Sequence, residues 1–533
     1  MKRTLSIILV SLCSIAASAQ SKYFELGKAL DIQNTILKQL AVSYVDTLQF
    51  DKLVMTGVDA MLESLDPYTV YFPEEEEDNV EMMTTGNYGG VGSLIKKKPG
   101  CGVVITEPYP NSPAVKAGLA PGDTIISIDG KDVFDETSEQ SSNRMKGQPG
   151  TDVRFKVIKG RTRDTVDVVV RREKIHVPNV ENVQMIQDSI GYILLSGFTQ
   201  GAAQEVKEAV QQMKQQGARR LVLDLRGNGG GLMSEAIGIV SLFVPKGTLA
   251  VSSKGRAQGM NVEYRTQKEP VDTEIPLMVM INSGSASASE IVAGALQDLD
   301  RAFIAGTRSF GKGLIQTVRP TSYNGAVKIT TGKYYTPSGR CVQAIDYSHR
   351  NEDGSVGTIP DSLTHEFKTA GGRTVRDGGG ITPDCVVEGH KYSRPVVSVV
   401  LNDITGDFAT NYYKTHPEIA PAAEFALTDA EYEDFISFSE TQEFDFRSGA
   451  DAEMTKLIEA AQYDGLYDSC KAELDALKAK LDITKAEALR LAKDEIKPLL
   501  EADIAVKYYF QAASSIISLR SDKQLLECIS KWQ

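Results

Sequence analysis

Four serines lie close together in residues 282–290, where one of them could attack a carbonyl carbon. The run reads Asn-Ser-Gly-Ser-Ala-Ser-Ala-Ser-Glu, follows an apolar segment and opens an amphipathic one. A strand that ends at the start of a helix leaves a side chain beside several unpaired backbone N–H groups, which suits a nucleophile whose product is an oxyanion. A run of small residues that only caps the helix would look the same by composition.

A nucleophilic serine needs a base, and the sequence offers one lysine in a suitable setting. None of the five histidines occupies a glycine-bounded turn or a strand end in the expected core, so no Ser-His-Asp triad is predicted. Lys312 lies between Gly311 and Gly313 and precedes an apolar segment. A lysine can act as a base where burial disfavours its ammonium form. A surface lysine in a turn would give the same pattern.

A third segment, residues 224–232, ends an apolar strand with three consecutive glycines and opens a helix. Without Cβ atoms, glycine N–H groups can point into a site with no side chain in the way. The segment lacks the Gly-Lys-Ser/Thr of a P-loop and the Gly-x-Gly-x-x-Gly spacing of a dinucleotide site. We therefore expect an oxyanion hole here rather than a phosphate site.

These segments fall within residues 190–329, where apolar strands alternate with helices. Such alternation is typical of an α/β core whose central strands are covered on both faces. The predicted strands are 192–195, 221–225, 276–281 and 302–305, and the predicted helices are 203–213, 234–243 and 287–299.

The flanking regions have different textures. Residues 28–65 show helical spacing, and residues 86–172 read as short strands punctuated by glycine, with strands at 102–106 and 124–128, a helix at 113–118 and a turn at Asp129 and Gly130. Residues 346–380 are polar and glycine-rich, so we expect a loop or insertion. The chain from about residue 423, and strongly from 452 to 519, is rich in helix-forming residues.

Together, the three segments resemble the carboxyl-terminal processing (tail-specific) proteases, secreted or periplasmic serine peptidases with a Ser-Lys dyad. The resemblance rests on the Ser-Ala-Ser-Ala-Ser-Glu run and on Phe-Gly-Lys-Gly with a glutamine four positions after the lysine. It implies Ser287 as the nucleophile, Lys312 as the base and Gln316 as a residue that orients the lysine. It covers about residues 30–390, including motifs at 65–69, 335–340 and 381–384.

The same resemblance implies which backbone groups bind the oxyanion. Ala288 N–H would be one donor, and a glycine of the 224–231 turn would be the other, placed at Gly231 with Gly230 as the alternative. Two regions depart from the family pattern: the polar insertion at 346–380 and the long helical tail beyond 393.

The glycine-punctuated region resembles the PDZ module that this family carries before its catalytic core. Residues 88–93, Tyr-Gly-Gly-Val-Gly-Ser, look like its carboxylate-binding loop. The N–H groups of Val91, Gly92 and Ser93 could hold a terminal carboxylate while the peptide adds a strand to a sheet edge. The alternative is a glycine turn with a structural role only.

The start of the chain indicates an exported protein, and its charge argues against a nucleic-acid partner. Lys2 and Arg3 precede an apolar stretch over 5–17 and an Ala-Ser-Ala sequence, which together predict a signal peptide at 1–19 and a periplasmic or secreted location. With 58 Lys and Arg against 71 Asp and Glu, the chain has a formal net charge of −13, so we expect no nucleic-acid partner.

The cysteines predict neither a metal site nor a disulfide framework. Five lie beyond residue 19, at 101, 341, 385, 470 and 528, and their spacing is too wide for either. Scattered core thiols are favoured, with a bridge between Cys470 and Cys528 as the exception to test.

The sequence thus predicts a multidomain α/β protein, with an α/β serine-protease core, an inserted PDZ domain and flanking helical regions. The predicted parts are a signal peptide at 1–19, a helical region at 20–85, the PDZ domain at 86–173, the protease core at 174–393 and a helical domain at 394–533. We expect a serine endopeptidase that cleaves near the C-termini of exported proteins and recognises their free tails, with no metal or organic cofactor.

Two rival functions remain open at this point: an inactive PDZ-type peptide-binding scaffold, and an acyl-transfer or hydratase enzyme that uses the same glycine turn. The helical tail could form a homodimer or dock an adaptor protein.

Overall fold

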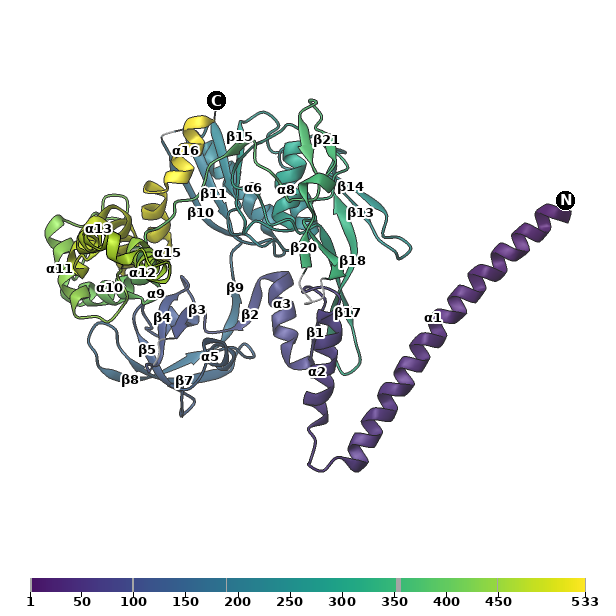
Figure 1. The fold of residues 1–533 in the computed structure, drawn as a ribbon, viewed down its shortest axis with the longest axis horizontal. Helices are drawn as coiled ribbons and strands as arrows, with labels where there is room; N and C mark the ends of the chain where they lie inside the picture. Colours follow the sequence, from purple (N-terminus) through teal and green to yellow (C-terminus); the bar gives the residue numbers. More distant parts are fainter. Residues whose placement is uncertain (1, 98–99, 188, 351–355, 448, 533) are drawn as a thin grey trace. The chain divides into compact units, whose positions relative to one another are not determined.

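The structure is a computed structural model that describes residues 2–97, 100–187, 189–350, 356–447 and 449–532. The chain divides into two compact units, which are described separately. The smaller contains Met1–Tyr71 with Val327–Ile329, and the larger contains Phe72–Ala326 with Thr330–Gln533. Figure 1 gives the labels of the elements.

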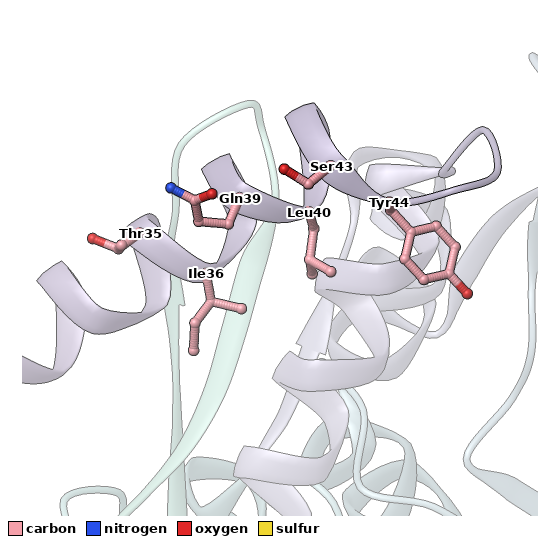
Figure 2. Close-up of a pocket in the computed structure, with 6 residues that line it drawn as sticks. All are labelled: Thr35, Ile36, Gln39, Leu40, Ser43 and Tyr44. Atoms are coloured by element: carbon pink, nitrogen blue, oxygen red, sulfur yellow. The ribbon is translucent and has the colours of Figure 1, made fainter.

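The smaller unit is built from two helices, α1 (Lys2–Ser43) and α2 (Phe50–Glu63). After α2 the carboxylate of Asp66 accepts the backbone N–H groups of Tyr68 and Thr69, both at 2.8 Å, so the motif at 65–69 is a side-chain-capped turn. Among the described helices, none combines the length and the apolar character needed to cross a bilayer. A hollow of about 350 Å³ lies along the end of α1 (Figure 2), lined by Thr35, Ile36, Gln39, Leu40, Ser43 and Tyr44.

The larger unit contains the predicted α/β core, and its strand–helix order is confirmed. Five parallel strands and one antiparallel edge strand form a sheet in the order β10-β11-β12-β15-β16-β23. The strands are β10 (Val180–Ile186), β11 (Ile190–Leu195), β12 (Arg220–Asp224), β15 (Leu277–Ile281), β16 (Phe303–Gly306) and β23 (Cys385–Val386), and the helices of this region are α6 (Ala202–Gln215), α7 (Met233–Val240) and α8 (Ala288–Asp298).

The two faces of this sheet are covered by different parts of the chain. Side chains of successive strand residues point to opposite faces, and those of Leu221 and Leu223 pack in one cluster with α6, α7 and α8. The side chain of Val222 packs instead against the last helix of the chain, α16 (Lys523–Lys531), and against Trp532 just beyond it. The predicted cover on both faces is therefore present, and the far C-terminus supplies one side of it.

A second sheet lies beside the core and contains the strand that follows the candidate lysine. Its strand β13 is paired with β18 through Ser252 and Tyr335. The strands of this sheet in the larger unit are β17 (Leu314–Pro320), β18 (Ala326–Tyr335, which also supplies the short segment of the smaller unit), β13 (Leu249–Lys254) and β14 (Val262–Arg265); β1 (Val70–Phe72) pairs with β18.

The glycine-punctuated region folds around its own small hydrophobic core. Its sheet has the order β3-β4-β5-β7-β8, so β3 is an edge strand, and the predicted turn at Asp129 and Gly130 has φ of 48° and 76°. The elements around this core are η1 (Glu74–Glu76), α3 (Glu77–Thr85), β2 (Asn87–Gly90), β3 (Ser93–Lys97), β4 (Val103–Pro108), α4 (Pro113–Lys116), β5 (Thr124–Ile128), β6 (Lys131–Asp132), α5 (Ser138–Met145), β7 (Asp152–Ile158), β8 (Thr165–Arg171) and β9 (Glu173–His176).

Of the two alternatives for 346–380, the loop is wrong for the residues that the structure describes, and the insertion stays a prediction. Two hairpins occupy the segment, and the second has a cross-strand ion pair of 2.6 Å between Arg376 and Glu366. These strands are short and have polar residues on both faces. They therefore lack the alternation of apolar and polar residues that predicts a strand. The elements are β19 (Ile345–Arg350), β20 (Val356–Thr358), η2 (Asp361–Leu363), β21 (Glu366–Lys368) and β22 (Thr374–Arg376).

The tail is helical, as predicted, and most of its helices share a separate core. The proposed bridge between Cys470 and Cys528 is absent, because both thiols are free and Cys528 packs against the core sheet in the same cluster as Cys385. The tail helices are α9 (Arg394–Leu401), α10 (Ile404–Thr415), α11 (Asp429–Glu440), α12 (Gly449–Tyr463), α13 (Tyr467–Leu481), α14 (Lys485–Leu491), α15 (Lys493–Arg520) and α16.

Candidate active site

The structure separates the four serines of the run between β15 and α8. Ser285 and Ser289 are fully buried, and their hydroxyls donate to the carbonyl oxygens of Leu225 and Asn228, each at 2.8 Å. These two hydroxyls therefore have structural partners. Ser283 is exposed on the loop, whereas Ser287 is half-buried directly before the first residue of α8.

Ser287 has an unusual backbone conformation. Its φ of 55° and ψ of −110° lie in a region that residues with a side chain rarely adopt. Such a conformation costs on the order of 1–3 kcal/mol and persists only where the surroundings enforce it. A sharp turn from a strand into a helix is thus held in place at the serine that the family resemblance assigns as nucleophile.

The buried carboxylate of Glu290 enforces this turn. Its Oε2 accepts the backbone N–H groups of Ser287 and Lys312, both at 2.8 Å. Its Oε1 accepts the Ser309 hydroxyl at 2.6 Å and the Gly311 N–H at 2.7 Å. Burial raises the pKa of Glu290, and these four donors act in the opposite direction by favouring the carboxylate. One side chain therefore joins the nucleophile loop to the lysine loop.

A second buried group joins the same two loops. The hydroxyl of Tyr334, on β18, donates to the Lys312 carbonyl at 2.8 Å and lies 3.2 Å from the Ser287 carbonyl. Tyr334 is only 1% exposed, and this burial raises its pKa well above the usual value, so the phenol stays a donor. The structure thus brings the predicted serine and lysine together through two shared contacts.

Sequence reasoning assigned no role to Glu290 or Tyr334. Glu290 follows Ser287 by three positions, which is the spacing of a capping box, and this signal could have identified it. Tyr334 stands in an ordinary strand pattern that distinguishes it from no other aromatic core residue.

Gln316 is the third side chain of the predicted site, and it forms a hydrogen bond with a residue of β18. The amide Nε2 of Gln316, on β17, donates to the hydroxyl of Thr330 on β18 at 3.3 Å. This hydrogen bond fixes the amide across two paired strands. The role of Gln316 in orienting Lys312 stays a prediction.

The glycine turn lies against the nucleophile loop. A Cβ atom on Gly230 would come within 2.7 Å of the Ala286 carbonyl oxygen and 2.9 Å of the Ala288 nitrogen, so only glycine allows this approach. The N–H of Gly230 already donates to the Asn228 side chain at 2.9 Å. Within the described residues, the N–H groups of Gly231 and Ala288 have no hydrogen-bond acceptor.

Two asparagines hold the glycine turn in register with the nucleophile loop. Asn282 Oδ1 accepts the N–H of Gly227 at 2.8 Å. Asn228 donates from Nδ2 to the Leu195 carbonyl at 2.7 Å, and its own carbonyl accepts the Ala286 N–H at 3.0 Å. The turn is therefore fixed by side chains and backbone from three strand ends of the core sheet.

The predicted carboxylate-binding loop lies at the edge of the small sheet. It leads into edge strand β3, next to which α5 packs. Gly92 has φ of 72°, and the carbonyls of Val91 and Gly92 accept N–H groups of Ala114 and Tyr109, both at 2.9 Å. In the described part of the chain, the N–H groups of Val91 and Gly92 have no acceptor, and the buried hydroxyl of Ser93 has no partner.

In the described ranges, no three or more His, Cys, Asp or Glu side chains gather as metal ligands could.

Three regions of the chain match known protein families. Peptidase family S41 matches residues 189–351, the PDZ domain family matches residues 75–170, and a family described as the C-terminal helical domain of a probable PDZ-protease matches residues 396–530. The predicted fold class, with its protease core, PDZ domain and helical tail, is confirmed.

Individual proteins are also similar to this chain. The chain is 35% identical over 344 residues to a carboxy-terminal-processing protease of Bartonella bacilliformis, which covers 64% of this chain and 77% of that protein. It is 33% identical over 310 residues to a probable CtpA-like serine protease of Staphylococcus aureus, covering 58% and 61%. The solved photosystem II D1 C-terminal processing protease is 27% identical, with a TM-score of 0.37, covering 66% and 86%. The chain therefore belongs to the carboxy-terminal-processing proteases, the serine-type proteases of Peptidase family S41.

Proposed function

We propose that Ser287 and Lys312 form the catalytic dyad of an endopeptidase that cleaves near the C-termini of exported proteins. The observation that carries this proposal is the shared acceptor Glu290 Oε2, which binds the N–H groups of both residues at 2.8 Å. A base and a nucleophile that act together must be positioned together, and a buried carboxylate common to both loops provides that positioning.

In the proposed mechanism, Ser287 Oγ attacks the carbonyl carbon of the scissile peptide bond while Lys312 Nζ, in its neutral form, takes the hydroxyl proton. The oxyanion accepts hydrogen bonds from the N–H groups of Gly231 and Ala288, which have no other acceptor in the described residues. Lys312 then returns the proton to the leaving amine. Water then attacks the resulting acyl-enzyme while Lys312 takes a proton from the water. Lys312 passes this proton to Ser287 Oγ as the acyl group leaves.

Substrate selection falls to the PDZ domain in this proposal. The free N–H groups of Val91 and Gly92 would bind the terminal carboxylate, while the tail pairs with the edge of β3. The signal-like sequence at 1–19 supports a reaction in the periplasm or outside the cell.

The test uses an unfolded protein with an apolar C-terminus as substrate. Ser287→Ala should abolish cleavage and leave the melting temperature unchanged within a few degrees. Ser283→Ala is the matched control, because Ser283 is the exposed serine of the same loop, and it should cleave at the wild-type rate. Full cleavage by Ser287→Ala would contradict the dyad, and tail binding by a wild-type protein that never cleaves would favour the inactive scaffold.

A further inference from the structure

Arg226 connects the oxyanion turn with the last helix of the chain. Its Nε and Nη2 donate to both carboxylate oxygens of Asp224, at 2.5–3.0 Å. Its Nη2 also donates to Asp522 Oδ2 at 2.6 Å, and its Nη1 donates to Gln524 Oε1 at 2.9 Å. Asp522 and Gln524 lie at the start of α16, nearly 300 positions along the chain from Arg226.

Both partners from α16 are themselves fixed. Asp522 Oδ1 accepts the backbone N–H of Leu525 at 2.9 Å and so caps the helix. Gln524 Nε2 donates to the Val387 carbonyl at 2.7 Å. Behind them the apolar face of α16 packs on the core sheet, and the guanidinium of Arg220 lies 3.9 Å from the centre of the Trp532 ring.

Arg226 lies two residues after the end of β12, within the 224–231 turn. Its own backbone N–H donates to Asp224 Oδ1 at 2.9 Å, and the next N–H, of Gly227, binds Asn282. A guanidinium presents its donors in a rigid planar fork, so fixing the fork from two sides also fixes the backbone that carries it. The Asp224 carboxylate is in turn fixed by the Tyr192 hydroxyl at 2.7 Å.

We propose that Asp522 and Gln524 are positioning residues for catalysis, which act through Arg226 to hold the turn that presents the Gly231 N–H to the oxyanion. This inference rests on the proposed function, because it needs an oxyanion hole at this turn. It gives the C-terminal helix a part in the chemistry, although none of its residues contacts the reacting atoms.

The site also permits a clean substitution. Arg226, Asp224, Asp522 and Gln524 line a cavity of about 790 Å³, so an altered side chain at 522 meets no packed wall. Asp522→Asn has the same shape, and asparagine caps helices as well as aspartate does. With Oδ1 kept for the cap, the new amide N–H₂ replaces Oδ2 and faces Arg226 Nη2, so a donor opposes a donor.

The first measurement compares steady-state kinetics of Asp522→Asn with those of Glu527→Gln. Glu527 lies on the same helix in an exposed pair with Lys531, so its variant controls for a lost carboxylate on α16. We expect kcat to fall about tenfold in Asp522→Asn with KM changed less than twofold, since a misplaced oxyanion donor weakens transition-state binding. Glu527→Gln should match the wild type. Gln524→Met, which leaves the cap intact, should lower kcat in the same manner if Asp522→Asn proves unstable.

A double-mutant cycle tests the route of the effect. Arg226→Lys keeps a positive charge beside Asp224 but cannot reach all three partners. If Asp522 acts through Arg226, the double variant should have the kcat of Arg226→Lys alone. Losses that multiply would overturn the inference, and so would a wild-type kcat in Asp522→Asn. If Ser287→Ala is inactive while Asp522→Asn is unaffected, this inference fails and the proposed function stands; if Ser287→Ala remains active, the proposed function itself fails.

Discussion

Glu290 determines how Ser287 and Lys312, the proposed catalytic residues, lie with respect to each other. It is fully buried, yet its two oxygens accept four donors, among them the N–H groups of Ser287 and Lys312. A buried carboxylate is costly unless it is hydrogen-bonded in this manner. The positive φ of Ser287 depends on this anchor.

Glu290→Gln should therefore lower kcat by at least tenfold. Whichever way the amide is oriented, its N–H₂ group faces two of the four donors and leaves them without an acceptor. The matched control is Glu433→Gln, an exposed glutamate whose side chain is 51% accessible, and it should leave kcat unchanged. Equal kinetics in the two variants would contradict the role of Glu290.

The pH dependence of kcat should differ between the wild type and Glu290→Gln, and its direction follows from the pKa of Glu290. Burial raises the pKa of Glu290, so ionisation of this group opposes folding, and that cost is absent below the unfolded-state pKa and complete above the folded-state pKa. Activity has the opposite requirement, because only the carboxylate accepts all four donors. We expect kcat to decline as the pH falls through the raised pKa, and this acid limb should be missing in Glu290→Gln.

At the scale of the elements, helix α8 is fixed at both ends. Glu290 holds its first turn, and at its last turn the buried Asp298 carboxylate lies 2.8 Å from the buried Arg340 guanidinium. Arg340 is the last residue of the motif at 335–340, for which the sequence predicted no role. The motif thus positions the helix that begins directly after Ser287, the proposed nucleophile.

Arg340→Met should destabilise the protein by about 3–5 kcal/mol, because it leaves the Asp298 charge buried and unpaired. Denaturant titration of the free energy of unfolding measures this loss. The double variant Arg340→Met with Asp298→Leu should recover a large part of it, since no buried charge remains. A loss below about 1 kcal/mol in the single variant would contradict the ion pair.

The edge strand β3 makes a separate prediction about tail binding. A peptide that adds to this edge places its last carboxylate at the N–H groups of Val91 and Gly92. Amidating the tail should weaken its binding to Ser287→Ala roughly ten- to a hundredfold, as expected for a charged hydrogen bond worth on the order of 1.5–3 kcal/mol. Isothermal titration measures both affinities. Equal affinities would make the loop a structural turn.

The sequence predicts elements better than contacts. Apolar strands and amphipathic helices identify the core from 190 to 306 to within a few residues, and family motifs predict Ser287 and Lys312 as the catalytic pair. The strand pairs at 346–380 escape because their polar strands lack an apolar period. The role of Glu290 escapes because three of its four partners come from a loop about 20 positions away. Pairings such as Arg226 with Asp522 depend on packing between distant segments, which periodicity does not encode.

For the whole molecule, the larger unit is tied together by the end of the chain. Helix α16 covers the face of the core sheet opposite α6, α7 and α8, so the protease core is complete only with the tail in place. The tail region was predicted as a helical domain with an open role. Its last helix packs on the sheet of the protease core.

Trp532, the only tryptophan of the chain, reports directly on this packing. It is 6% exposed, so its emission should be blue-shifted in the folded protein. Because α16 is part of the core, the denaturant transition seen by this fluorescence should coincide with the loss of activity. A red shift at lower denaturant, with activity intact, would show that α16 detaches without consequence.

The most direct measurement of the account is the identity of the nucleophile. A fluorophosphonate probe phosphonylates an activated serine, and peptide mass spectrometry locates the adduct. We expect a single adduct on Ser287 in the wild type. We expect none in Lys312→Ala, because the hydroxyl then lacks its base. An adduct on Ser283, Ser285 or Ser289, or undiminished labelling of Ser287 in Lys312→Ala, would contradict the Ser-Lys dyad.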